Sequence, residues 1–215
     1  MRTMKKRMKK KMMSPTYDNE NNLIKTGCKY VAGADEAGAG SIVGPVVAAA
    51  VILDKDNIDP RIKDSKKLSK KDREELYDII VESCVSCAVG INTVERIDEI
   101  NILWARLEAM KKAVEAIGFP VDHVLVDGDK KVPDLKVEQT AIIRGDGKSY
   151  SIAAASIIAK VTRDRMLAFM GREWMEYGLD SNKGYWCKKV VNQVKRDGYI
   201  KDFHRKVFVR KILDE

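Results

Sequence analysis

Residues 30–53 read YVAGADEAGAGSIVGPVVAAAVIL, two apolar runs separated by acidic residues and glycines. The first run begins at Tyr30 and the second covers Val46–Leu53, and their content of Val, Ile and Ala predicts two buried strands. Asp35 and Glu36 stand between these runs. Because consecutive strand residues point to opposite faces of a sheet, we expect the chain to turn here if the two carboxylates share one ligand.

The glycines after the acidic pair permit such a turn. Gly38 and Gly40 flank Ala39, and a backbone with so few side-chain atoms can lie close to a phosphate group. Paired carboxylates on a strand supply the oxygen ligands that Mg²⁺ or Mn²⁺ prefers. An Asp-Glu pair before glycine is also typical of a solvated strand end, so the pattern alone leaves metal binding and an ordinary turn both open.

Composition favours one large domain with a polyanionic partner. The chain has 215 residues, 45% of them hydrophobic, which is enough for a substantial core. Lys and Arg number 40 against 32 Asp and Glu, a formal charge of +8, and nucleic acid is the natural partner for such a surplus.

The basic surplus is concentrated at the N-terminus. Residues 1–13 contain seven basic residues and no acidic one, and we predict a disordered basic extension over residues 1–27. A phosphate anchor and a membrane-surface contact remain alternatives for this tail. Neither the tail nor any later segment is apolar for long enough to be a signal peptide or a membrane span. We therefore expect a cytoplasmic protein.

The cysteines favour the same compartment. They include one C-x-x-C pair, Cys84 and Cys87, besides Cys28 and Cys187. A zinc site would need two further ligands, yet no second C-x-x-C pair and no nearby histidine accompany the motif. Buried, reduced thiols are the more typical interpretation in an intracellular protein.

Periodicity predicts that strands and helices alternate through the remainder of the core. A carboxylate at the C-terminal end of a buried strand, such as Asp127, lies where an α/β sheet usually places its chemistry, although an Asp that ends a strand before Gly is more often a turn residue. The expected elements are a helix from Ser69 to Glu82, a strand over Cys84–Ile91, a helix over Ile97–Ile117, strands over His123–Val126 and Ala141–Ile143, and a helix over Ile152–Phe169.

Three motifs together resemble ribonuclease HII, the type 2 ribonuclease H family. They are the acidic stretch described above, DSKKL at residues 64–68 and SIAAASIIAK at residues 151–160, and the resemblance continues in register from Tyr30 to Phe208. It implies an α/β, ribonuclease H-like fold. A central mixed five-stranded sheet, whose first three strands form an antiparallel meander, would be flanked by helices in a catalytic core over residues 28–170. Residues 171–215 would form a helical, substrate-binding extension of the same domain.

The resemblance implies four catalytic carboxylates that hold metal ions, namely Asp35, Glu36, Asp127 and Asp146. Asp164 is a rival for the fourth position, but an Asp within a helix between Arg163 and Arg165 is more typical of a surface ion pair. Carboxylate ligands favour Mg²⁺ or Mn²⁺ over zinc. Two such ions would promote hydrolysis that leaves 5′-phosphate and 3′-hydroxyl ends.

The resemblance also implies a set of substrate-binding residues. Tyr185 would stack on the sugar that follows the ribonucleotide, although Tyr185 beside Trp186 is equally typical of a packed aromatic pair. Most family members have a basic residue where this chain has Ala39, so a charged phosphate contact is absent here. The full set is Gly38, Ala39, Gly40, Lys66, Lys67, Ser156, Lys160, Lys183 and Tyr185. Separately, the basic residues around a predicted amphipathic helix over Val190–Lys195 indicate a groove for the duplex backbone, lined by Lys183, Lys188, Lys189, Lys195 and Arg196.

The implied activity is that of a monomeric endonuclease. It would hydrolyse the RNA strand of RNA–DNA hybrids and cut 5′ to ribonucleotides embedded in duplex DNA. Another nuclease of the same fold, such as a junction resolvase, is an alternative because it would share the metal carboxylates without needing Tyr185. A weakly active hybrid-binding protein is a second alternative, motivated by Ala39, although a pure binder gains nothing from acids clustered near phosphate.

Overall fold

The computed structural model describes residues 14–213, with only the backbone described for Glu176, Asp180 and Ser181. It contains one five-stranded sheet in the order β3-β2-β1-β4-β5. The first three strands are antiparallel, whereas β4 pairs in parallel with both β1 and β5, which confirms the predicted mixed sheet. The strands are β1 (Val31–Ala37), β2 (Val46–Ile52), β3 (Ser86–Asn92), β4 (His123–Asp127) and β5 (Glu138–Ile142).

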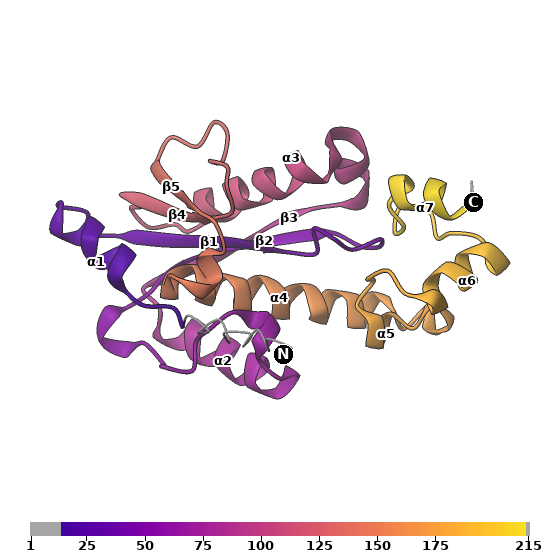
Figure 1. The fold of residues 1–215 in the computed structure, drawn as a ribbon, viewed down its shortest axis with the longest axis horizontal. Helices are drawn as coiled ribbons and strands as arrows, with labels where there is room; N and C mark the ends of the chain where they lie inside the picture. Colours follow the sequence, from indigo (N-terminus) through magenta and orange to yellow (C-terminus); the bar gives the residue numbers. More distant parts are fainter. Residues whose placement is uncertain (1–13, 214–215) are drawn as a thin grey trace, which may run out of the picture.

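Helices cover both faces of this sheet. The long helix α3 (Val94–Glu115) lies on one face, and α2 (Lys70–Ser83) and α4 (Tyr150–Met170) lie on the other (Figure 1). Beyond α4, the chain forms three short helices at the end of the molecule that the β1–β2 connection approaches (Figure 1). These are α5 (Leu179–Asn182), α6 (Lys188–Asp197) and α7 (Lys206–Leu213), and the 3₁₀ turns are η1 (Lys55–Asn57), η2 (Ser65–Lys67), η3 (Gly145–Gly147) and η4 (Met175–Tyr177).

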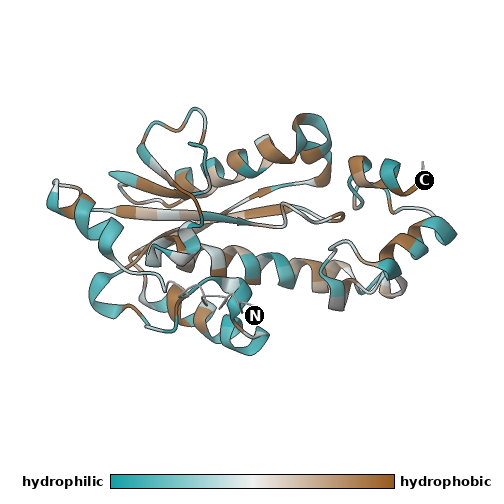
Figure 2. Ribbon diagram, in the orientation of Figure 1, coloured by the Kyte–Doolittle hydropathy of each residue, from teal (hydrophilic) through white to brown (hydrophobic). Residues whose placement is uncertain are grey.

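Small residues bring the helices close to the sheet. Every residue of β2 is buried, and Figure 2 shows hydrophobic residues along the central strands and hydrophilic ones on much of α1 and α6. A side chain at Gly33 would overlap the backbone of α4 at Ser151, and one at Gly90 would overlap α3 at Ala109. Glycine at these two positions therefore lets a helix backbone pack directly on a strand.

Side-chain caps set where the helices begin, at the predicted residue for α2 but earlier than predicted for α3 and α4. Ser69 and Asp72 form a reciprocal capping box at the start of α2. Helix α3 begins earlier than predicted because Thr93 accepts a hydrogen bond from the Arg96 N–H and caps it. The same helix kinks at Asn101, which has a left-handed backbone with a φ of 63°.

The structure differs from the sequence prediction near the N-terminus. Residues 1–13 lie outside the described part of the chain, but Asp18–Lys25 form helix α1 where we predicted a disordered extension up to residue 27. The buried Glu20 carboxylate accepts hydrogen bonds from Ser149 Oγ at 2.6 Å and from the Ser151 N–H at 2.9 Å. This helix is therefore attached to the start of α4. The division at residue 170 between core and extension stays a prediction.

Candidate active site

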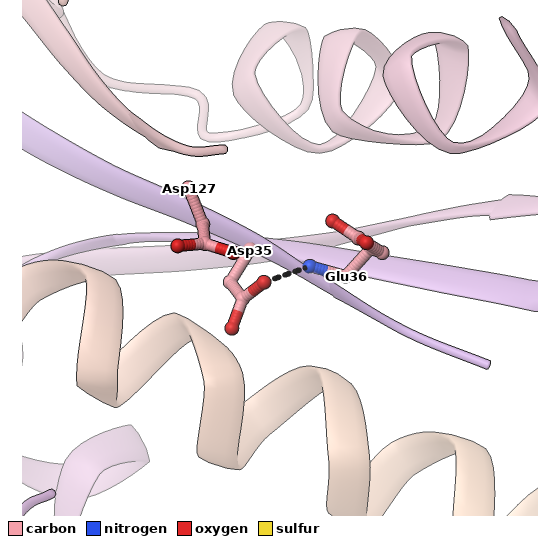
Figure 3. Close-up of side chains that lie close together, drawn as sticks. All are labelled: Asp35, Glu36 and Asp127. Atoms are coloured by element: carbon pink, nitrogen blue, oxygen red, sulfur yellow. Dashed lines mark hydrogen bonds between the residues drawn. The ribbon is translucent and has the colours of Figure 1, made fainter. Parts of the chain in front are cut away.

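Three of the predicted acids converge at one end of the sheet. Strands β1 and β4 run parallel with Ala34 opposite Val126, so the next residues, Asp35 and Asp127, lie at the same level of the sheet. Glu36 follows on β1. Asp35, Glu36 and Asp127 each offer a ligand oxygen within 4.8 Å of the other two (Figure 3).

The convergence does not require the turn that we expected between Asp35 and Glu36. Both residues belong to the regular part of β1, where they lie opposite Ala49 and Ala48 of β2, and their side chains point toward opposite faces (Figure 3). They still meet because the pairing of β1 with β4 stops at Ala34. Asp127 is the last residue of β4, directly beyond that point, and both carboxylates of β1 lie close to it. The prediction of a turn was therefore wrong.

Neighbouring elements hold each carboxylate in place. The Arg106 side chain of α3 donates from Nη1 to Glu36 Oε1 at 3.1 Å, and the Gly145 N–H of η3 donates to Asp127 Oδ1 at 2.6 Å. Asp35 Oδ1 accepts from the Glu36 N–H at 2.7 Å (Figure 3). Glu36 Oε2 is buried and has no hydrogen-bond partner among the described residues, which leaves one acceptor of this carboxylate unused.

The electrostatics of the cluster disfavour its full ionisation. Burial, followed by the charges of Glu36 and Asp127, raises the pKa of Asp35 well above its usual range. Burial also raises the pKa of Glu36, and the ion pair with Arg106 offsets this only in part. Crowded carboxylates with one unpartnered oxygen fit a divalent cation, because an ion of that charge would neutralise them and take oxygen ligands.

Asp146 lies beside this cluster and outside its tightest part. It is buried in η3, and its Oδ2 is 3.7 Å from the Lys66 ammonium nitrogen of η2. Burial raises the pKa of Asp146, and the nearby carboxylates of Asp64 and Asp127 raise it further. Asp64 is an acid that we had not selected. It is the first residue of the DSKKL motif, and this position could have identified it. Its side chain accepts a hydrogen bond from the Lys66 N–H and caps η2.

The rival acid, Asp164, has a different environment from the one we predicted. It is buried and pairs with Lys160 one helical turn away, at 2.8 Å. Arg163 is completely buried and bonds to backbone carbonyl groups, and Arg165 pairs with Glu74 instead. The interpretation of Asp164 as a surface pair with its flanking arginines was wrong.

The predicted substrate residues lie on several elements. Ser156 of α4 shares a hydrogen bond of 2.9 Å with Ser65 Oγ, and its hydroxyl opposes the rise in the Asp35 pKa. Lys67 pairs with Asp64 at 3.3 Å. On α6, the four predicted groove residues Lys188, Lys189, Lys195 and Arg196 are exposed.

Tyr185 stands where the C-terminal segment meets the β1–β2 connection. This residue is 38% exposed, and the centroid of its ring lies 5.3 Å from the Lys160 ammonium and 5.7 Å from the Arg163 guanidinium carbon. Trp186 makes its aromatic contact with Phe208, at a centroid distance of 6.4 Å. Tyr185 therefore presents an exposed face beside two cations.

The fold and the acidic cluster together define a metal-dependent nuclease with a ribonuclease H-like fold. A sequence model of the family described as Ribonuclease HII matches residues 32–211. The chain belongs to the ribonuclease HII family, and it is an endoribonuclease.

Known relatives agree with this assignment. The chain is 46% identical to the ribonuclease HII of Fusobacterium nucleatum over 209 residues, which covers 94% of this chain and 96% of the relative. It is 45% identical over 194 residues to the enzyme of Caldanaerobacter subterraneus, which covers 90% and 80% respectively.

Solved structures show the same architecture. The ribonuclease H2 of Pyrococcus horikoshii superposes with a TM-score of 0.71 at 29% identity, covering 86% of this chain and 97% of that one. A ribonuclease HIII solved in complex with Mn²⁺ shares the fold with a TM-score of 0.69 at 20% identity, covering 86% and 69%. Within residues 14–213, no helix has the length and apolar character needed to cross a bilayer.

Proposed function

We propose that this endonuclease hydrolyses the RNA strand of RNA–DNA hybrids and cuts 5′ to single ribonucleotides embedded in duplex DNA. The observation that carries the proposal is the convergence of Asp35, Glu36 and Asp127, with an unpartnered Glu36 oxygen, at the ends of two parallel strands. Nucleic acid fits the overall charge of +8.

The acidic set would hold Mg²⁺ or Mn²⁺, with Asp146 as an additional ligand. Bound divalent ions supply Lewis-acid charge for water activation and for the leaving 3′-oxygen. Oxygen-only ligands in a buried cluster support this choice of hard cations. The Mn²⁺ complex of the ribonuclease HIII that shares this fold is consistent with it.

The surrounding residues would orient the substrate. Lys66, exposed beside Asp146, offers a cation for a phosphate near the acids. Tyr185 offers an aromatic face to a sugar or base. The Gly38–Gly40 backbone would contact the 2′-hydroxyl, the group that distinguishes RNA from DNA. A monomer that acts in the cytoplasm remains our prediction.

One assay tests the activity against its alternatives. Cleavage is measured with Mg²⁺ or Mn²⁺ on an RNA–DNA hybrid, on a duplex with one ribonucleotide and on a four-way junction. We expect products from the first two substrates with 3′-hydroxyl ends, and no product when metal is chelated. Cleavage of the junction alone would favour a resolvase, and binding to the hybrid without any cleavage would favour a hybrid-binding protein.

A further inference from the structure

Two buried arginines lie beneath the connection between β1 and β2. Arg163 comes from α4 and Arg205 from the segment just before α7, and their exposed fractions are 0% and 1%. Both reach the same loop, Gly38–Pro45, which begins directly after the acidic pair on β1. The two side chains therefore connect the loop to elements more than a hundred residues away in the sequence.

Together the guanidinium groups bind most of the loop's carbonyl oxygens. Arg163 donates to Pro45 O at 2.9 Å and Val43 O at 2.9 Å, and also to Ser41 Oγ at 2.7 Å. Arg205 donates to Gly38 O at 2.8 Å, Ala39 O at 3.1 Å and Gly44 O at 3.0 Å. Planar guanidinium forks can serve several acceptors at fixed angles, which fixes the peptide planes of the loop.

These contacts are costly for a purely structural purpose. Among the side chains that the structure describes, no carboxylate lies within 4.0 Å of a charged nitrogen of Arg163 or Arg205. Burial lowers the pKa of both guanidinium groups, and the charge of Arg163 adds to the effect on Arg205. Buried charges are expensive unless fully hydrogen-bonded, and apolar side chains can fill the same volume more cheaply.

The position of Arg163 also requires a glycine at the start of the loop. Gly38 has a φ of 94°, and a Cβ atom there would overlap the Arg163 guanidinium. The carbonyl groups of Gly38 and Ala39 are thereby bound from beneath. In contrast, no hydrogen bond among the described residues uses the N–H groups of Ala39 and Gly40, and a Cβ atom at Gly40 would meet no atom within 4 Å.

Arg163 joins this loop to the segment that carries Tyr185. Its Nη1 donates to Lys183 O at 3.1 Å, and its guanidinium lies beside the Tyr185 ring. Ser41 Oγ, which accepts from Arg163, itself donates to Gly184 O at 2.7 Å. The Ile42 N–H also donates to Gly184 O, at 2.9 Å. Arg163 thus acts together with these direct bonds to hold the glycine loop beside the tyrosine.

We propose that Arg163 and Arg205 are positioning residues for ribonucleotide recognition. They hold the carbonyl groups of Gly38–Pro45 inward, so that the N–H groups of Ala39 and Gly40 stay available to the ribonucleotide at a fixed distance from Tyr185. Neither arginine touches the substrate in this arrangement. The inference rests on the proposed function, because it explains how that function selects a ribose.

Lysine variants test the proposal, because Arg163→Lys and Arg205→Lys keep the positive charge and remove the planar fork. Arg165→Lys is the matched control, since Arg165 lies on the same helix but is partly exposed and pairs with Glu74. Each change is made in an Asp127→Asn background, which prevents cleavage. Affinities for a duplex with one ribonucleotide and for the same duplex in all-DNA form are then compared by fluorescence anisotropy.

We expect both lysine variants to reduce the ratio of the two affinities about tenfold, the effect of losing one or two hydrogen bonds to the 2′-hydroxyl. The Arg165→Lys control should keep the ratio. Mn²⁺ affinity, measured by calorimetry in proteins with Asp127 intact, should be the same for all three variants. An unchanged ratio, or a parallel fall in Mn²⁺ affinity, would overturn the positioning role.

A milder variant covers the case in which the lysine variants do not fold. Ser41→Ala removes one acceptor of Arg163 and keeps both arginines, and it should lower the same ratio by a smaller factor. A ratio equal to that of the parent protein would overturn the proposal. If the parent protein itself shows no preference for the ribonucleotide duplex, the proposed function fails. If the parent protein shows the preference and the variants keep it, only the positioning role fails.

Discussion

At the scale of single residues, the two glycines around Ala39 serve different purposes. Gly38 has a left-handed backbone and packs on Arg163, so the fold itself requires a glycine there. Gly40 has neither a positive φ nor a neighbouring atom that a Cβ would meet. Its bare backbone is explained by close approach of the substrate, which is part of the function proposed above.

Alanine at each position separates these purposes. We expect Gly40→Ala to leave the free energy of unfolding within about 0.5 kcal/mol of the parent value, as for a surface substitution, and to lower kcat/KM on a single embedded ribonucleotide. Gly38→Ala should destabilise the fold by roughly 1–3 kcal/mol through backbone strain and through displacement of Arg163. Denaturant unfolding and steady-state kinetics check both. Equal effects of the two variants on stability would contradict the distinction.

At the scale of elements, sequence patterns predicted what is local and missed what depends on distant partners. The all-apolar β2 and the capping box of α2 were readable because each is set by neighbouring residues. The geometry of Asp35 and Glu36 could not be predicted in this way, because it depends on where β4 stops pairing with β1. Arg163 follows the pattern of an exposed helical residue, yet most of its acceptors lie more than a hundred residues earlier.

Helix α1 is a second case of this kind. Its composition, DNENNLIK, is typical of a solvated segment, and only the fold shows that Glu20 receives bonds from Ser149 and Ser151 at the start of α4. Thr16 adds backbone bonds with Lys148 and Tyr150 on either side of the same site. The N-terminal segment thus supports the turn that carries Asp146.

This attachment predicts different results for two N-terminal truncations. Deletion of residues 1–13 should leave the melting temperature unchanged. Deletion of residues 1–25, or Glu20→Ala alone, should lower stability by about 1–3 kcal/mol, because Ser149 Oγ and the Ser151 N–H lose a charged acceptor. Thermal unfolding of the three proteins provides the comparison. A Glu20→Ala protein as stable as the parent would show that α1 makes no energetic contribution to α4.

At the scale of the whole molecule, the sheet collects acids from distant parts of the chain and covers both of its faces with helices. The resemblance to ribonuclease HII implied a set of four carboxylates, and the structure brings three of them, Asp35, Glu36 and Asp127, together. The resemblance did not predict the energetic state of the cluster. That state depends on burial and on the mutual distances of Asp35, Glu36 and Asp127, which no local pattern contains.

The raised pKa values make the metal-free cluster a source of pH-dependent instability. Folded pKa values of Asp35, Glu36 and Asp146 lie above their unfolded values. The folded state therefore binds more protons, and the cluster's favourable contribution is present below the unfolded pKa values and is lost as the pH rises through the folded ones. Bound Mg²⁺ or Mn²⁺ should restore stability at neutral pH.

The most direct measurement is the thermal unfolding of Asp35→Asn beside the parent protein at neutral pH, with EDTA and with Mn²⁺, together with cleavage of an RNA–DNA hybrid. We predict that the variant melts at a higher temperature than the parent in EDTA, gains less from Mn²⁺, and loses at least about 100-fold in activity, since even outer-shell partners of a metal contribute 10–100-fold. A variant that melts below the parent in EDTA, gains as much from Mn²⁺ and still cleaves the hybrid would contradict a buried acidic cluster that binds the catalytic metal.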